Sequence, residues 1–190
     1  KPLGRDKMPF AFEKLPIPGP LLIKPDILRD HRGTFMEIYR YSEFANAGIT
    51  GHFIQDNISK SKKNTLRGLH YQKNPKAQGK LVYCLKGKIF DIVVDIRIGS
   101  PTYAQWISME LSEENNFMLY VPATFAHGFL ALSDTAEVIY KCTEEYSPKD
   151  EGGIIWNDPD IKIKWPVANP TLSEKDKKLP ALRAADNNFR

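Results

Sequence analysis

Two cations and one imidazole lie close together in the segment 65–72 and just after it. The segment reads Thr-Leu-Arg-Gly-Leu-His-Tyr-Gln, so it presents Arg67 and His70 beside a glycine, and Lys80 follows eight residues after Gln72. Histidine is the side chain whose ordinary pKa suits proton abstraction near neutral pH. Carried on a strand, these groups indicate an anion-binding site with a proton-transfer group. Taken alone, the cluster is better explained as a strand-end histidine with solvated basic neighbours. Evidence from the rest of the chain is therefore needed to choose between this explanation and a functional site.

Short β segments are expected to position these residues. Fourteen prolines and twelve glycines interrupt the chain, which favours β structure over long helices. The β-rich stretches are 22–28, 34–41, 52–59, 65–72, 80–85, 88–97, 103–111, 117–121, 128–132 and 137–144. With no strand–helix–strand rhythm, about ten strands predict an all-β sandwich or jelly-roll barrel.

Local signals supply further detail. Stretches 80–85 and 88–97 read as a hairpin that turns at Gly87. In its second arm Asp91, Asp95 and Arg97 interrupt an apolar run. Two short helices are expected, one capped by Ser42 and ending at Gly48, the other capped by Ser173 and ending at Lys178. The segment 147–170 reads as a loop.

Length and composition place limits on function. A chain of 190 residues with 42% apolar and 26% charged residues suits one globular domain over residues 1–190. We expect residues 1–7 to be a disordered start or a remnant of expression. The net charge of +4 is dispersed and no apolar run is long enough for a membrane helix, so we expect neither a nucleic-acid nor a membrane partner. Two cysteines without a C-x-x-C pair, and no signal peptide, favour a cytoplasmic protein.

Ten short stretches in order resemble the dTDP-4-dehydrorhamnose 3,5-epimerase family, whose members have a cupin-type jelly roll. The stretches are 30–37, 55–59, 66–72, 78–81, 90–97, 122–129, 140–141, 146–148, 156–160 and 172–176. The resemblance therefore implies a cupin-like jelly-roll barrel with a few short, mainly C-terminal helices. It also implies a cytoplasmic isomerase that inverts C3 and C5 of dTDP-4-dehydro-6-deoxy-D-glucose to give dTDP-4-dehydro-L-rhamnose, for dTDP-L-rhamnose biosynthesis.

The resemblance also implies roles for four catalytic residues. His70 matches the base, and Asp176 matches the carboxylate that hydrogen-bonds this imidazole. Tyr140 matches the general acid on the opposite face of the sugar, and Lys80 matches the residue near the C4 oxygen, where an ammonium stabilises enolate charge. A positioned acid or base supplies roughly 10²–10⁴-fold, so no cofactor is expected.

Further residues match positions that bind the nucleotide sugar. These are Arg32, Glu37, Gln55, Asn57, Arg67, His127, Glu151 and Lys175, with His127 in a supporting role. In this family some nucleotide contacts come from the N-terminal strand of a neighbouring subunit, so the resemblance implies a homodimer with a shared N-terminal strand.

Other functions stay open at this point. A single-carbon epimerase or a 3,4-ketoisomerase of a related dTDP-4-keto sugar would use the same barrel, and so would a non-catalytic nucleotide-sugar binding module or a metal-dependent cupin oxygenase. The four histidines are widely separated and form neither an H-x-H pair nor H-E-x-x-H, so we expect no metal site.

Overall fold

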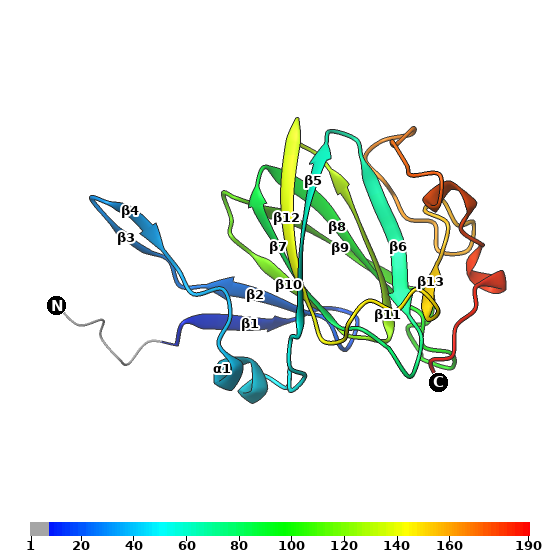
Figure 1. Cartoon of the computed structure of the whole chain (residues 1–190), viewed down its shortest axis with the longest axis horizontal. Coiled ribbons are helices and arrows are strands. Elements are labelled where there is room, and N and C mark those ends of the chain that lie inside the picture. The colour runs from blue at the N-terminus through cyan, green and yellow to red at the C-terminus, as the bar shows by residue number, and fades with distance from the viewer. Residues whose placement is uncertain (1–7) are drawn as a thin grey trace.

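Two antiparallel sheets that face each other form the body of the protein in a computed structural model, which describes residues 8–190. The expectation for residues 1–7 lies outside the described residues. One sheet has the strand order β1-β2-β10-β7-β12-β5, the other has the order β13-β6-β11-β8-β9, and β3 and β4 form a separate hairpin that projects from the body (Figure 1). The predicted all-β, cupin-like jelly-roll fold with a few short helices, mainly C-terminal, is confirmed.

The strands of the six-stranded sheet are β1 (Phe10–Lys14), β2 (Leu21–Pro25), β10 (Met118–Val121), β7 (Lys80–Lys86), β12 (Thr135–Cys142) and β5 (Gln55–Lys62). Those of the five-stranded sheet are β13 (Glu151–Gly153), β6 (Leu66–Gln72), β11 (Phe125–Ala131), β8 (Lys88–Asp95) and β9 (Trp106–Ser112). The hairpin comprises β3 (Leu28–Asp30) and β4 (Gly33–Phe35), and the helices are α1 (Tyr41–Asn46) and the one-turn 3₁₀ helices Asp176–Lys178 and Leu182–Ala184.

Apolar side chains between the sheets fix the separation of the two walls. Val82 and Val138 of the six-stranded sheet pack with Val93 and Phe129 of the five-stranded sheet in one buried cluster. Alternate residues of a strand point to opposite faces of its sheet. Consequently every second residue of β5, from Gln55 to Ser61, is more buried than its neighbours and lies on the inner face.

Two further apolar clusters cover the outer faces. Ile154, Leu182 and Phe189 of the C-terminal segment pack with Leu69 and Ile92 of the five-stranded sheet. In Figure 1 this orange and red segment runs alongside β6 and β13. Residue Phe44 of α1 belongs to another cluster that includes strand residues of the six-stranded sheet. The C-terminal cluster matters for the site because it holds the segment that carries Lys175 and Asp176 beside β6.

The predicted hairpin at Gly87 is wrong, although the turn itself is present. Strand β7 pairs with β10 and β12, whereas β8 pairs with β9 and β11, so Gly87 carries the chain from one sheet to the other. Its φ is +75°, and a Cβ there would lie 2.2 Å from the carbonyl oxygen of Thr135. Sequence periodicity identifies two strands and a turn but does not indicate which strands pair.

Other element boundaries also differ from the prediction. Strand β13 lies within the predicted loop 147–170, and β1 was not predicted at all. Helix α1 begins at Tyr41 with Arg40 at its N-cap position and no side-chain cap, so Ser42 is not the capping residue. The helix expected from Ser173 is shortened to the turn Asp176–Lys178, although the hydroxyl of Ser173 does accept the backbone N–H of Asp176 at 3.0 Å.

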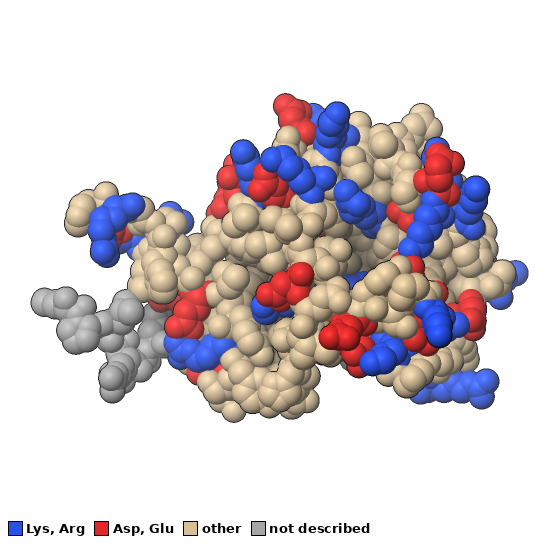
Figure 2. All heavy atoms as spheres, viewed as in Figure 1, with Lys and Arg blue, Asp and Glu red and all other residues tan. Residues whose placement is uncertain are grey.

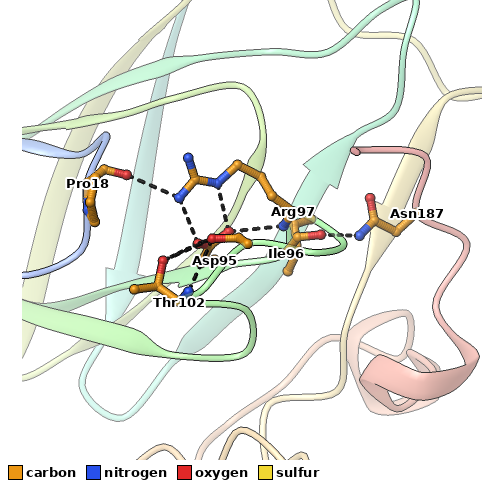
Figure 3. A network of polar contacts seen from close by, with 7 residues as sticks. Pro18, Asp95, Ile96, Arg97, Thr102 and Asn187 are labelled. Atoms are coloured by element: carbon orange, nitrogen blue, oxygen red, sulfur yellow. Dashed lines mark hydrogen bonds and ion pairs between the residues drawn. The ribbon is translucent and has the colours of Figure 1, made fainter.

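A buried carboxylate ties the end of β8 to the loops around it. Asp95 accepts hydrogen bonds from the backbone and guanidinium of Arg97 and from the hydroxyls of Ser100 and Thr102 (Figure 3). Arg97 in turn donates to the carbonyl of Pro18 at 3.2 Å. Burial raises the pKa of Asp95, but these donors outweigh burial and lower it to about 2. The network is structural and lies outside the residues that the sequence singles out as functional.

Candidate active site

A carboxylate holds the imidazole of His70. Nε2 of His70 lies 2.7 Å from Oδ1 of Asp176, and the carboxylate is buried while the imidazole is 30% exposed. Burial raises the pKa of Asp176, but the hydrogen bond and charge of His70, with weaker help from Gly68 and Ser173, lower it below its ordinary value. The carboxylate therefore stays ionised and accepts Nε2–H, which leaves Nδ1 of the neutral imidazole free to take a proton.

Tyr140 lies on the wall opposite His70. Tyr140 belongs to β12 of the six-stranded sheet and His70 to β6 of the five-stranded sheet, and both line two cavities of about 430 and 370 Å³. Figure 2 shows this face of the molecule hollowed between the regions of β12 and β6, with Lys and Arg side chains on both sides. Burial raises the pKa of the Tyr140 phenol, and the nearby charge of Arg67 partly offsets this. A proton acceptor and a protonated phenol thus face the same two cavities from opposite walls.

Lys80 and a second histidine–carboxylate pair lie deeper in the barrel. Lys80 begins β7, between Val121 and Cys142 in the register of the sheet. Burial lowers the pKa of its ammonium, while the negative charges of Asp91 and Glu151 act in the opposite direction. Nε2 of His127 lies 2.9 Å from both carboxylate oxygens of Asp91. Burial raises the pKa of Asp91, although His127 and Lys80 oppose this shift.

Polar groups of β5 and β6 line the same space. The guanidinium of Arg67 donates from Nε to the hydroxyl of Ser61 at 3.0 Å and faces the larger cavity. Gln55 and Asn57 line the smaller cavity, and Nε2 of Gln55 donates to Oδ1 of Asn57 at 3.1 Å. Both amide oxygens accept hydrogen bonds within the protein, and each amide also donates one N–H, from Gln55 to Asn57 and from Asn57 to the sulfur of Cys142. One N–H of each amide is therefore left to meet a ligand with hydrogen-bond acceptors.

Glu151 connects two elements at the rim. It forms an ion pair with Lys175 and accepts the hydroxyl of Tyr146 at 2.9 Å. Burial raises the pKa of Glu151, but its bonds with Lys175 and Tyr146 outweigh burial and lower it. Glu151 lines the smaller cavity and Lys175 the larger one, so this pair lies where the two cavities adjoin His70.

Comparisons with known proteins identify the family of this chain. The family model described as dTDP-4-dehydrorhamnose 3,5-epimerase matches residues 14–184. The curated dTDP-4-dehydrorhamnose 3,5-epimerase of Shigella flexneri is 51% identical over 164 residues, which is 86% of this chain and 91% of that protein. The chain belongs to the dTDP-4-dehydrorhamnose 3,5-epimerase family. It is an epimerase, and the predicted family and function are confirmed.

Solved structures agree. The dTDP-6-deoxy-D-glucose-3,5-epimerase of Legionella pneumophila, in complex with dTDP-4-keto-L-rhamnose, is 43% identical with a TM-score of 0.89, over 92% of this chain and 94% of that chain. The 3'-monoepimerase ChmJ of Streptomyces bikiniensis, in complex with dTDP-quinovose, is 37% identical with a TM-score of 0.85, over 90% of this chain and 87% of that chain. One fold thus serves both double and single epimerases.

Two predicted binding residues of this epimerase lie away from the two cavities that His70 lines. Arg32 is exposed at the tip of the β3–β4 hairpin, where Asp30 accepts its Nε at 3.0 Å. Glu37 follows the hairpin and forms an ion pair with Arg40. Neither side chain lines either of the cavities that contain His70, so the structure does not bring them to the site of their own chain.

Sequence reasoning assigned no role to Asp91, which holds His127. The signal was present, because an aspartate in the middle of the apolar strand β8 has to find a partner when the strand is buried. It also assigned none to Ser61 and Tyr146. Their partners, Arg67 and Glu151, lie in other elements, and only the assembled barrel shows those contacts.

Each histidine of the site is paired with a carboxylate. His70 and His127 are opposite each other in the register of β6 and β11, but each Nε2 contacts a carboxylate of its own. Within residues 8–190 no group of three or more His, Cys, Asp and Glu side chains is arranged to hold a metal ion. None of the described helices is long and apolar enough to span a membrane.

Proposed function

We propose that this epimerase inverts C3 and C5 of dTDP-4-dehydro-6-deoxy-D-glucose and gives dTDP-4-dehydro-L-rhamnose for dTDP-L-rhamnose biosynthesis. The observation that carries the proposal is the placement of His70 and Tyr140 on opposite sheets around the same cavities. Inversion beside a ketone needs a base on one face of the sugar and an acid on the other. The two walls supply one of each.

His70 acts as the base in this proposal. Its Nδ1 takes the proton from the carbon next to the C4 ketone, and the resulting imidazolium is stabilised by the ionised carboxylate of Asp176 at 2.7 Å. The base forms no hydrogen bond from Nδ1 to the residues that the structure describes. Nδ1 is therefore available to substrate.

Tyr140 acts as the acid, and Lys80 stabilises the intermediate. A phenol whose pKa is raised by burial keeps its proton at neutral pH and delivers it to the enolate carbon from the opposite wall. The ammonium of Lys80 forms no hydrogen bond or ion pair within the described part of the chain. Its charge therefore remains available for the enolate oxygen, and the dry surroundings that lower its pKa also strengthen that interaction.

The nucleotide part of the substrate is bound by the polar groups around these residues. Arg67 and Lys175 on the larger cavity suit the diphosphate, and Gln55, Asn57 and Glu151 supply hydrogen bonds on the smaller one. His127, held by Asp91, supports the wall behind His70. We propose that no cofactor or metal takes part, because enolate formation needs only the proton donors, acceptors and cation named above.

We also propose a homodimer in which the β3–β4 hairpin reaches a neighbouring subunit. The hairpin projects from the body of the protein (Figure 1) and exposes Phe35 and Leu28. Such apolar exposure on a projecting element is typical of an interaction surface. Arg32 and Glu37, which line neither of the cavities that contain His70 in their own chain, would then complete the nucleotide site of the partner.

Complementation tests the shared site. Arg32→Ala and His70→Ala should each form inactive or weakly active homodimers, while unfolding and refolding of a mixture should restore activity, because one site in each heterodimer has both residues intact. A mixture no more active than its parents would show that Arg32 serves its own chain or no site. Light scattering of the unaltered chain should give twice the mass of the monomer.

Solvent deuterium tests the reaction itself. Incubation with dTDP-4-dehydro-6-deoxy-D-glucose in D₂O should place deuterium at both C3 and C5 in NMR spectra, and a rhamnose-forming reductase should then consume NADPH. Label at one carbon alone would favour the runner-up, a single-carbon epimerase, which the likeness to the 3'-monoepimerase ChmJ keeps relevant. Absence of label would refute both. We also propose that the chain is a single domain that works in the cytoplasm, which agrees with the unpaired state of Cys84 and Cys142.

A further inference from the structure

A buried serine orients the arginine of the larger cavity. Ser61 lies on the inner face of β5 and is only 3% exposed, and its hydroxyl accepts Nε–H of Arg67 at 3.0 Å. Strand β5 belongs to the six-stranded sheet and β6, which carries Arg67, to the other. The contact therefore joins the two walls of the barrel immediately beside the cavity that Arg67 and Tyr140 line.

We propose that Ser61 is a positioning residue of the epimerase, whose hydroxyl presents the guanidinium of Arg67 to the diphosphate of the bound nucleotide sugar. The inference rests on the proposed function and assigns no contact with substrate to Ser61 itself. The contact with Ser61 explains why Arg67, although exposed, points in a fixed direction on the cavity wall before the ligand binds.

The chemistry of the partner supports this role. Asp30 and Asp95 hold Arg32 and Arg97 by ion pairs, which fix a guanidinium but also neutralise its charge. Arg67 forms no ion pair with any carboxylate of residues 8–190; its partners are the hydroxyl of Ser61 and, at 3.5 Å, the carbonyl of Lys60. A neutral hydroxyl fixes the direction of the group and leaves its full positive charge for an anion.

The atom that Ser61 engages also matters. A hydrogen bond at Nε leaves Nη1 free, and Nη2 is only weakly held at 3.5 Å from the Lys60 carbonyl. The edge formed by Nη1 and Nη2 can bind two phosphate oxygens at once. An unrestrained arginine side chain carries roughly 2 kcal/mol of rotamer entropy, and the contact with Ser61 removes part of that freedom in advance.

A second effect is expected on the phenol across the cavity. The charge of Arg67 lowers the pKa of Tyr140 against the opposing influence of burial. A guanidinium that is held near the phenol also stabilises the phenolate that remains after Tyr140 has given its proton away. Loss of the Ser61 hydroxyl should weaken both effects, because the charge is then free to move into solvent.

A double-mutant cycle tests the proposal with dTDP itself as the probe. Ser61→Ala should raise the Kd of dTDP, measured by calorimetry, and the KM of the keto sugar by about tenfold, with a smaller change in kcat. In an Arg67→Ala background the same substitution should change Kd by less than about twofold. Equal effects in both backgrounds, or no effect on Kd in either, would overturn the positioning role.

Two further variants keep the result interpretable. Ser112→Ala removes a hydroxyl that is also buried and also accepts one hydrogen bond, at 3.1 Å from Asn115, but Ser112 lies at the end of β9 away from the cavities. It should bind dTDP as the unaltered chain does. Should Ser61→Ala not fold, Arg67→Lys keeps the charge and loses the Nε contact, so it should weaken binding about tenfold; unchanged affinity would refute the role of the contact. If Ser61→Ala binds dTDP normally and the unaltered chain turns over the keto sugar, the positioning role of Ser61 is refuted and the epimerase function stands.

Discussion

Replacement of Asp176 by asparagine is the most informative perturbation of the proposed base. The side chain keeps its shape, so the segment that the C-terminal cluster holds in place should stay folded. What is lost is the charge that faces the His70 imidazolium at 2.7 Å in a buried position. A hydrogen bond to a charged group contributes about 1.5–3 kcal/mol. At 1.36 kcal/mol per decade, that range corresponds to a decrease in kcat of about 10–150-fold.

The assay follows NADPH consumption by an added rhamnose-forming reductase, and solvent deuterium exchange at C3 and C5 should slow by the same factor. The Kd of dTDP should change less than about twofold, because the carboxylate stabilises the base and not the nucleotide. Asp158→Asn is the matched control: Asp158 is a buried aspartate of the same C-terminal segment, but it accepts only backbone N–H groups, including that of Leu182 at 2.7 Å. It should lose stability and keep kcat when assayed below its melting temperature.

A folded Asp176→Asn protein with kcat within threefold of the unaltered chain would refute the reasoning. The imidazole would then work without its carboxylate, and Asp176 would be a structural residue that ties the turn after Ser173 to β6. A proportional fall in stability and activity in both Asp176→Asn and Asp158→Asn would have the same meaning, because it would show that the segment and not the charge is required.

Three further outcomes are expected. Tyr140→Phe should bind dTDP with unchanged Kd but lose at least about 10²-fold in kcat, and normal product formation in an NMR time course would exclude it as the acid. Lys80→Met should lower kcat by about 10²–10³-fold, because the cation that stabilises the enolate oxygen is lost. Thermal unfolding should show a folded protein that is at least as stable as the unaltered chain, because a buried ammonium is removed. A destabilised protein with normal kcat would contradict both expectations. Asp95, whose pKa is lowered to about 2, contributes about 2 kcal/mol to the free energy of unfolding. Since the pKa of Asp95 is lower in the folded than in the unfolded state, this contribution is complete above about pH 4 and is lost as the pH falls toward 2. The denaturant midpoints of the unaltered chain and of Asp95→Asn should therefore converge over that interval. A difference between the midpoints that does not depend on pH would contradict the assignment.

Much of this protein could be predicted from local sequence. The β-rich stretches, the turn at Gly87 and the family resemblance through segments such as 66–72 and 122–129 led to an all-β epimerase, and the comparisons confirm this. These features depend on neighbours along the chain, which a single sequence displays directly.

The tertiary structure decided which of those residues meet. Residues 70 and 176 are far apart in sequence, and their contact exists because the C-terminal segment packs on the outer face of the five-stranded sheet. Gly87 and the turn after β11 move the chain between sheets, which places Tyr140 opposite His70 and not beside it. Arg32 and Glu37 match the family as well as Arg67 does, yet only the arrangement of the hairpin shows that they lie outside their own cavity. Spacing along a chain fixes the face on which a side chain lies, whereas strand pairing and packing across the barrel fix what that face meets.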